Sequence, residues 1–340
     1  MSLVQARPGA WLTDADELSH ESNGAALWSE NWLTYAWCPN VLVGIYFHIC
    51  RRPGPIGVYE ETFNVYLPGD RFLTTRGFAP LVSGAPSVAG VLFRCDEPFR
   101  RWTKRFRGAA RLVTGDELRA GPLVDGPYID VDLELEIRAM SPPFDIGSQH
   151  LTQAWGTGHY EQHHEVSGVL RFGDERIELA GAGLRDHSWG PRDWEGIGDT
   201  TWFHGQFPES GRSFMGISVP GRPPFEPYTY ACISDRESVH EVEFVSVPHV
   251  TAPYTPDTPY EFSFAGADGV SVIRAELVQS MPMSFMRPAE IGIGFHRGAP
   301  TTTHDFRENM TRFEWDGEVG YGLVTGARDV IDTEEGAHGA

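Results

Sequence analysis

The sequence is poor in cysteine and in basic residues, and each shortage excludes a class of protein. The four cysteines are Cys38, Cys50, Cys95 and Cys232, and no two of them form a CxxC pair. This spacing fits neither a zinc site nor a dense disulfide framework. Lysine and arginine number 27 against 47 acidic residues, which gives a net charge of −20. Such a surface repels phosphate groups. We therefore expect neither nucleic acid nor anionic membranes as partners.

Several segments and motifs are also missing. No apolar run reaches the roughly 18 residues of a membrane-spanning helix. The N-terminal segment MSLVQARPGAWLTDADELSH lacks the apolar core of a signal peptide. We therefore expect a cytoplasmic protein with reduced thiols and no transmembrane segment. There is no GxGxxG after a strand, no P-loop and no GxSxG nucleophile elbow, so we expect no nucleotide or other cofactor.

The chain is instead rich in turn-forming and aromatic residues, with 38 glycines, 25 prolines and 12% aromatic residues. Short β-rich runs separated by turns extend from Trp32–Trp37 to Val270–Leu277, and the one helix candidate lies near Gly115–Arg119. Val131–Ile137 alternates apolar and acidic residues, so one face of that strand should be buried. Phe172–Arg176 has the composition of a hairpin turn. This pattern predicts an all-β protein of sandwich or barrel architecture.

The densest cluster of reactive side chains is Arg185-Asp-His-Ser-Trp-Gly-Pro-Arg-Asp-Trp194. In an extended strand, Asp186 and Ser188 would lie on one face, and His187 and Trp189 on the other. Proton-transfer groups beside large aromatic rings are suited to acid–base chemistry on an apolar substrate. The stretch is therefore the first candidate for a functional site.

A carboxyl group packed against tryptophan is poorly solvated, so its pKa rises and it can act as an acid near neutral pH. Asp186 is the first candidate for this acid and Asp193 is the second. His187 could orient this acid or return a proton to it. The alternative is a structural corner, in which Arg185 or Arg192 pairs with Asp193 and the tryptophans fill the core.

Two other charged stretches could have either a functional role or a purely structural one. His159–Glu165 contains three histidines but lacks metal-ligand spacing such as HExxH, so no metal site is expected. Tyr160 and Glu161 could donate into a cavity, or the strand could face solvent. Phe99–Arg107 is basic, and we favour a solvated strand that balances nearby acids over an anion-binding patch.

Two aromatic segments carry further candidates. Glu30 lies between two tryptophans, one of them Trp32, and could line a pocket or an edge of a sheet. Trp202 and His204 share one face of a predicted strand, which could face a cavity or the core. The residues that we expect to contact a substrate are Glu30, Trp32, Tyr160, Glu161, Trp189, Trp194, Trp202 and His204.

The stretch Leu184–Trp194 resembles the carotenoid hydratase (hydroxyneurosporene synthase) / AttH-like superfamily, including its bacterial branch. Trp28–Trp32, Tyr160–Gln162 and Arg312–Gly317 followed by Gly320–Gly322 support the resemblance, which covers most of the chain. It implies two lipocalin-like β-barrels in tandem, with a ligand cavity in or between them. Members of the superfamily include carotenoid hydratases, fungal kievitone hydratase and cyclase or Diels–Alderase-type enzymes, which act mostly on apolar isoprenoid or polyketide-like substrates.

We therefore expect two lipocalin-like domains, residues 1–178 and 179–340, with an approximate boundary. The expected function is a cofactor-independent hydratase (hydro-lyase) or cyclase that acts on an apolar, alkene-bearing terpenoid or other isoprenoid. The alternative is a non-catalytic carrier of a hydrophobic small molecule, which needs a cavity but no converging titratable groups. A homo-oligomer is compatible with either function.

In the enzymatic hypothesis, a protonated Asp186 or Asp193 adds its proton to the double bond. His187 or Tyr160 positions water, in a dry cavity that protects the cation. The tryptophans that would stabilise this cation through their electron-rich faces are Trp189, Trp194 and Trp202.

Overall fold

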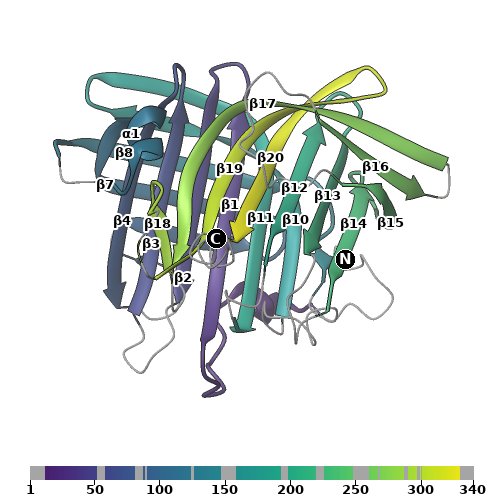
Figure 1. The fold of residues 1–340 in the computed structure, drawn as a ribbon, viewed down its shortest axis with the longest axis horizontal. Coiled ribbons are helices and arrows are strands. Elements are labelled where there is room, and N and C mark those ends of the chain that lie inside the picture. The colour runs from purple at the N-terminus through teal and green to yellow at the C-terminus, as the bar shows by residue number, and fades with distance from the viewer. Residues whose placement is uncertain are drawn as a thin grey trace, which may run out of the picture.

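The described residues of the chain form two antiparallel β-sheets with very little helix (Figure 1). This computed structural model describes residues 12–329 except 52–57, 81–86, 89, 124–125, 147–157, 193–197, 220–225, 248–259, 267–268, 287–289, 297–298 and 300. Among the described residues, the helices are η1 (Asp14–Glu17) and α1 (Gly115–Ala120), the latter where the sequence predicted one. Neither of these helices has the length and apolarity that a membrane-spanning helix needs.

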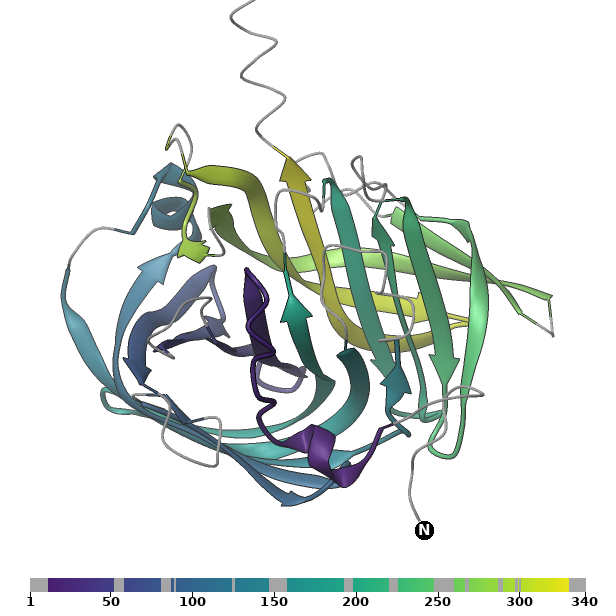
Figure 2. The same cartoon turned by 90° about the horizontal axis from the view of Figure 1, so that it is seen from below.

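The first sheet closes into an eight-stranded barrel. Its eleven strands are β1 (Trp28–Cys38), β2 (Val43–Arg51), β3 (Val58–Leu67), β4 (Arg71–Pro80), β5 (Ser87–Val88), β6 (Val91–Glu97), β7 (Arg101–Thr114), β8 (Tyr128–Ala139), β9 (Phe144–Asp145), β10 (Gly158–Phe172) and β11 (Glu175–Pro191). The barrel follows the order β4-β3-β2-β1-β11-β10-β8-β7, and a pairing between β4 and β7 joins its ends. Figure 2 shows these strands encircling an interior, with η1 at the rim.

The second sheet is formed by the C-terminal part of the chain. Its nine strands are β12 (Thr200–Phe207), β13 (Arg212–Val219), β14 (Tyr228–Ser234), β15 (Val239–Ser246), β16 (Tyr260–Gly266), β17 (Gly269–Met286), β18 (Glu290–Ile293), β19 (Thr302–Trp315) and β20 (Glu318–Asp329). A pairing between β16 and β17 links the two ends of the strand order β16-β15-β14-β13-β12-β20-β19-β17. The fold is thus all-β with two lipocalin-like domains, as the resemblance implied.

The alternation in β8 decides which of its faces is buried. Val131, Leu133, Leu135 and Ile137 are at most 2% exposed and belong to the apolar core inside the first barrel. The acidic residues between them point outward, toward water. The predicted hairpin at residues 172–176 is also present, because Phe172 at the end of β10 pairs with Glu175 at the start of β11. Local patterning therefore specifies this side of the barrel.

The strands β19 and β20 lie beyond the last strand that the sequence predicted. Both faces of β19 are largely buried, and its buried positions include the polar residues Thr303, His304, Glu308 and Asn309. A strand buried on both faces does not alternate apolar with polar residues. The alternating pattern that identifies β8 is therefore absent from β19.

The two sheets pack against each other across a shared apolar cluster. Tyr35, Tyr46 and Leu184 of the first sheet join Trp202 and Leu323 of the second in this cluster. The chain passes from one sheet to the other between residues 191 and 200. The predicted domain boundary between residues 178 and 179 stays a prediction. The contact between the sheets matters for function because it buries polar groups from both of them.

Candidate active site

Strand alternation divides the predicted site residues between two faces of the first barrel. On β11, Asp186 and Ser188 line a cavity between the two sheets. His187 points the other way and packs on Trp32, with ring centroids 4.7 Å apart. Trp32 belongs to the core inside the first barrel. The predicted faces of β11 are confirmed, but the predicted site residues lie in two separate groups.

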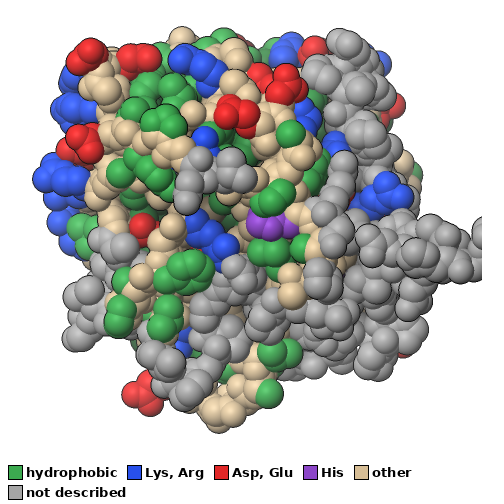
Figure 3. Space-filling model, turned by 60° about the vertical axis from the view of Figure 1, so that its left-hand side comes forward, with side chains coloured by type: hydrophobic (Ala, Val, Ile, Leu, Met, Phe, Trp, Pro, Cys, Tyr) green, Lys and Arg blue, Asp and Glu red, His purple; other side chains and the backbone are tan. Residues whose placement is uncertain are grey.

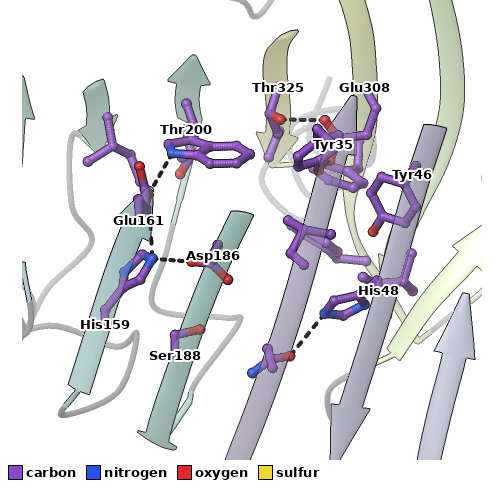
Figure 4. Close-up of a pocket in the computed structure, with 18 of the residues that line it drawn as sticks. Tyr35, Tyr46, His48, His159, Glu161, Asp186, Ser188, Thr200, Glu308 and Thr325 are labelled. Carbon is purple, nitrogen blue, oxygen red and sulfur yellow. Dashed lines mark hydrogen bonds and ion pairs between the residues drawn. The ribbon is translucent and has the colours of Figure 1, made fainter. Parts of the chain in front are cut away.

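The cavity lies where the outer face of the first barrel meets the second sheet. Side chains of β1, β2, β10 and β11 form one wall, and β12, β13, β17, β18, β19 and β20 contribute to the other. Its volume is about 110 Å³, whereas an engineered apolar cavity that binds benzene measures about 150 Å³. A space of this volume accommodates a reacting group rather than a whole isoprenoid chain. Figure 4 shows its polar side chains gathered in separate groups.

The first polar group surrounds His159 at the start of β10. Its Nε2 forms an ion pair with the Asp186 carboxylate and lies 3.4 Å from Glu161 Oε1. Glu161 Oε1 also accepts hydrogen bonds from Trp202 Nε1 (2.9 Å) and the Tyr230 hydroxyl (2.7 Å). These contacts connect the two sheets across the cavity wall (Figure 4).

The ion pair determines the charge of both its members. Burial disfavours the imidazolium of His159, but the nearby Asp186 and Glu161 outweigh it and raise the pKa of His159 to about 9. Burial also disfavours a charged Asp186, but its contact with His159 leaves the pKa of Asp186 below its ordinary value. At neutral pH, Asp186 is therefore a carboxylate that faces the cavity.

The second polar group surrounds Glu308 on β19, which is 1% exposed. The Tyr35 hydroxyl donates a hydrogen bond to Glu308 Oε1 at 2.5 Å, and the Thr325 hydroxyl donates to Oε2. Burial raises the pKa of Glu308 to about 8, although these two hydrogen bonds oppose the shift. At neutral pH, Glu308 is therefore a neutral carboxylic acid in most of the molecules.

Aromatic rings surround the space beside this acid. The Tyr35 ring lies 5.1 Å from the Tyr46 ring and 5.4 Å from the Trp202 ring. Phe285 and Phe306 stack at 4.2 Å and also line the cavity. Each aromatic face can stabilise a nearby cation by about 0.5–2 kcal/mol. The lining therefore combines a proton donor with surfaces that tolerate positive charge.

Sequence reasoning missed Glu308 and its partner Tyr35. Glu308 lies in a polar stretch without strand alternation, and the only nearby signal is the Arg312–Gly317 segment of the resemblance. The Tyr35 hydroxyl and the Glu308 carboxylate are separated by 273 positions in the sequence. No local pattern can connect groups so far apart in the chain.

Another set of the predicted residues lies inside the first barrel. His187 Nε2 is 3.1 Å from Glu30 Oε1. The Tyr160 ring contacts His187 edge-on at 5.5 Å, and the Tyr160 hydroxyl accepts a hydrogen bond from Arg185 Nη1 at 3.2 Å. Trp189 lies 5.0 Å from His187, between ring centroids. These residues form a polar cluster on the opposite face of β11 from the cavity.

Both arginines of the stretch have buried partners among the described residues, and their suggested pairing with Asp193 lies outside those residues. Arg185 Nη2 forms a buried ion pair with Glu17 Oε1 at 2.5 Å. Arg192 Nη2 donates to Ser188 Oγ at 2.6 Å. The predicted site residues that fall outside the described part of the chain are Asp193 and Trp194.

His204 is buried beside the cavity without lining it. Its ring lies 5.7 Å from Trp202 and 5.9 Å from Tyr35, between centroids. Burial lowers the pKa of His204 well below its ordinary value, and the neighbouring His163 adds to this effect. His204 is therefore neutral, and it contributes to the packing behind the aromatic wall.

The basic stretch at residues 99–107 has one exposed face, which carries arginines, whereas Lys104 on its other face is buried. Arg105 pairs with Glu134 at 2.6 Å, and Arg107 with Asp132 at 2.8 Å, all four on β7 and β8. Figure 3 shows basic and acidic side chains intermingled on one face of the molecule. These exposed pairs fit the interpretation of a strand that balances nearby acids for Arg105 and Arg107, and the buried Lys104 departs from it.

Comparison with known proteins gives a family and a shared fold. A model for a domain of unknown function, DUF7064, matches residues 13–329. The chain belongs to this family. No curated protein matches the sequence.

Solved structures with the same fold cover nearly the whole of this DUF7064 protein. They include an AttH-type protein from Nitrosomonas europaea, with 15% identity and a TM-score of 0.57 over 91% of this chain and 99% of that one. CghA has 14% identity and a TM-score of 0.53 over 90% and 89%. Kievitone hydratase from Nectria haematococca has 11% identity and a TM-score of 0.51 over 89% and 90%. At these identities the likeness establishes the fold alone, which supports the AttH-like resemblance but not a particular branch of it.

Proposed function

We propose that this protein is a cofactor-independent hydratase or cyclase that protonates a carbon–carbon double bond of an apolar, isoprenoid-like substrate. The observation that carries the proposal is Glu308, a buried acid with a raised pKa beside an aromatic cavity. In this proposal Glu308 takes the role that the sequence suggested for Asp186, because Asp186 is held as a carboxylate by His159. The fold shared with kievitone hydratase is consistent with this class of reaction.

In the first step, the Glu308 O–H bond breaks while the π electrons of the alkene form a new C–H bond. The product is a carbocation beside a Glu308 carboxylate. Hydrogen bonds from Tyr35 and Thr325 stabilise that carboxylate. The rings of Tyr46 and Trp202 stabilise the cation through their electron-rich faces. Both effects are stronger after proton transfer than before it, so they lower the barrier.

In the second step of a hydration, a water oxygen forms a C–O bond to the cation, and Asp186 accepts the proton that the water loses. His159 keeps Asp186 ionised and oriented for this role. In a cyclisation, a second double bond of the substrate attacks the cation, and Asp186 removes a proton from the neighbouring carbon. In either case Glu308 must regain a proton before the next turnover.

A non-catalytic carrier of a hydrophobic molecule is the alternative. CghA, which has this fold, was solved with the small molecule Sch210972. Two features of the cavity favour an enzyme over a carrier, namely the neutral acid Glu308 and the carboxylate Asp186. A carrier would bind its ligand without consuming it, so turnover separates the two functions.

The test is turnover of acyclic and cyclic terpenoid alkenes in water enriched in ¹⁸O. Hydration adds one labelled oxygen, and cyclisation gives an isomer without label, both detected by mass spectrometry. Glu308→Gln should lower the rate at least about 100-fold, because general acid catalysis contributes about 10²–10⁴-fold. Glu314→Gln is the matched control, since Glu314 lies on the same strand and its side chain is 42% exposed. Binding without turnover in the unmodified protein, or full turnover in Glu308→Gln, would contradict the proposal.

A further inference from the structure

A second cluster of polar side chains lies inside the first barrel, on the face of β11 opposite the cavity. His20 Nδ1 is 2.8 Å from Glu30 Oε1, and His187 Nε2 is 3.1 Å from the same oxygen. The three ligand atoms all lie within 4.8 Å of one another. Glu30 and His187 are fully buried, and the His20 side chain is 23% exposed. Two imidazoles and one carboxylate thus converge on a single point.

The outer nitrogens of both histidines are already engaged. His187 Nδ1 lies 2.8 Å from the backbone carbonyl oxygen of Asp16, which can only accept, so this nitrogen carries a hydrogen. His20 Nε2 lies 3.3 Å from Asp16 Oδ1 and is the donor for the same reason. Metal-binding histidines characteristically donate their second N–H to a carboxylate or a backbone carbonyl. Asp16 supplies both of these acceptors.

These outer contacts leave the inner nitrogens facing a negatively charged oxygen. With hydrogens on the outer nitrogens, neutral rings of His20 and His187 would direct lone pairs at Glu30 Oε1. A proton on each ring or one divalent cation between them would balance this oxygen, which also accepts a hydrogen bond from the backbone N–H of His20 at 2.9 Å. Glu30 Oε2 is buried and has no hydrogen-bond partner among the described residues, so it has a lone pair free for a ligand bond.

Aromatic rings hold the histidines in this arrangement. Trp189 stacks on His20 with centroids 3.8 Å apart, and Trp32 stacks on His187 at 4.7 Å. A tetrahedral zinc ion with bonds of about 2.0–2.1 Å separates its ligand atoms by about 3.3 Å. The observed separations of 2.8 and 3.1 Å need only a small outward shift to reach that value. The partly exposed ring of His20 gives an ion a route from solvent.

We propose that His20, Glu30 and His187 bind one divalent transition-metal ion, for which zinc is the closest fit. Imidazole and carboxylate ligands suit such ions, and three protein ligands leave a fourth position for water. The ion would fasten the N-terminal segment to β1 and β11 across the rim of the first barrel (Figure 2). The sequence predicted no metal because the three ligands come from separate segments and have no motif spacing.

The group at His159, Glu161 and Asp186 is a weaker candidate for the same ion. It offers one imidazole nitrogen, whereas the first cluster offers two. Oε1 of Glu161 already accepts hydrogen bonds from Trp202 and Tyr230. The two groups can be distinguished, because they share no residue and their members on β11, His187 and Asp186, point to opposite faces of that strand.

The experiment is titration of the full chain with Zn²⁺ by calorimetry, after treatment with a chelator and dialysis. We expect one strong site per chain, and Co²⁺ at this site should give visible absorption bands of a tetrahedral complex. His20→Ala should weaken Zn²⁺ binding at least about tenfold, since even the loss of a residue behind a ligand costs about 10–100-fold. His20 precedes β1 and lies outside both sheets, so this variant should fold even if Glu30→Gln does not.

Two matched histidine variants complete the test. His240→Ala removes an exposed imidazole on β15, and His159→Ala removes the imidazole of the weaker candidate group. Both should bind Zn²⁺ as the unmodified chain does. The proposal is wrong if the unmodified chain binds no Zn²⁺, if His20→Ala binds it unchanged, or if His159→Ala alone abolishes binding. Circular dichroism of each variant confirms that the sheets are intact.

Discussion

Tyr35 on β1 of the first sheet donates a hydrogen bond to Glu308 on β19 of the second. Both groups are buried, and both face the cavity between the sheets. The contact therefore joins the two domains, and it partly opposes the rise in the pKa of Glu308 that burial causes. The packing of the two sheets and the proposed chemistry depend on the same pair of residues.

Tyr35→Phe should lower the turnover rate and move the alkaline limb of the pH–rate profile upward. In the unmodified chain, the hydrogen bond from Tyr35 lowers the pKa of Glu308. Removing this bond therefore raises that pKa further. A hydrogen bond to a charged group contributes about 1.5–3 kcal/mol, which corresponds to a rate loss of roughly 10–100-fold. Tyr66→Phe is the matched control, because Tyr66 donates to the backbone carbonyl of Glu308 and not to its carboxylate. Equal effects of the two variants would contradict the role given to Tyr35.

The stability of the protein should fall as the pH rises from about 4.5 to about 8 because of Glu308. Its pKa is raised from 4.5 to about 8 in the folded chain, so between these values the folded state binds more protons than the unfolded state. The stabilisation is fully present below pH 4.5 and is lost as the pH rises through 8. Each pKa unit corresponds to about 1.4 kcal/mol, so the loss amounts to several kcal/mol.

Urea denaturation at pH 5 and at pH 8.5 measures this dependence of the free energy of unfolding. Glu308→Gln should lose less stability over the interval than the unmodified chain, because it has no carboxyl group to ionise there. Glu314→Gln should lose as much as the unmodified chain. Parallel curves for Glu308→Gln and the unmodified chain would mean that Glu308 does not titrate in this range.

The ion pair of His159 and Asp186 should show strong energetic coupling. Asp186→Asn removes the nearer of the two carboxylates beside the buried imidazolium, and breaking a buried pair in this way costs about 3–5 kcal/mol. Adding His159→Gln removes that charge, so the double variant should be less destabilised than the sum of the single variants. Denaturant unfolding of all four proteins gives the coupling energy. Additive effects would show that the two side chains do not form a charged pair.

Gly183→Ala should destabilise the first barrel. Gly183 lies on β11 opposite β1, and a Cβ atom there would overlap the backbone carbonyl of Tyr35. The two strands would have to separate, at a cost of roughly 1–3 kcal/mol. Gly266→Ala on β16 is the control, since its Cβ would meet only one side-chain atom, at 3.4 Å. The melting temperatures of the two variants should differ accordingly.

The sequence predicted much of the first barrel from local rules. Val131–Ile137 alternates, and the structure buries its apolar side chains. Residues 172–176 form a hairpin, and α1 begins at Gly115. Period-two alternation and turn composition are local properties, so they can be read without knowing what lies across the sheet.

The predicted faces of β11 were also correct, but the grouping of the site residues was not apparent from the sequence. Alternation puts Asp186 and His187 on opposite faces, and it does not say what each face meets. The structure brings Asp186 to the cavity with His159, and His187 to the barrel interior with Glu30. Because Asp186 and His187 are adjacent in the sequence, they were assigned to one predicted site, although the barrel wall separates their side chains.

By itself, the sequence determined that the chain is all-β and that its densest acid and aromatic cluster lies on a strand. Only the tertiary structure decided which acid is neutral. The pKa of Glu308 depends on burial between two sheets and on hydroxyl groups from β1 and β20, whereas Asp186 is ionised because β10 supplies His159. Solvation and charge pairing are set by neighbours in space, and in a β-barrel most of those neighbours come from distant parts of the chain.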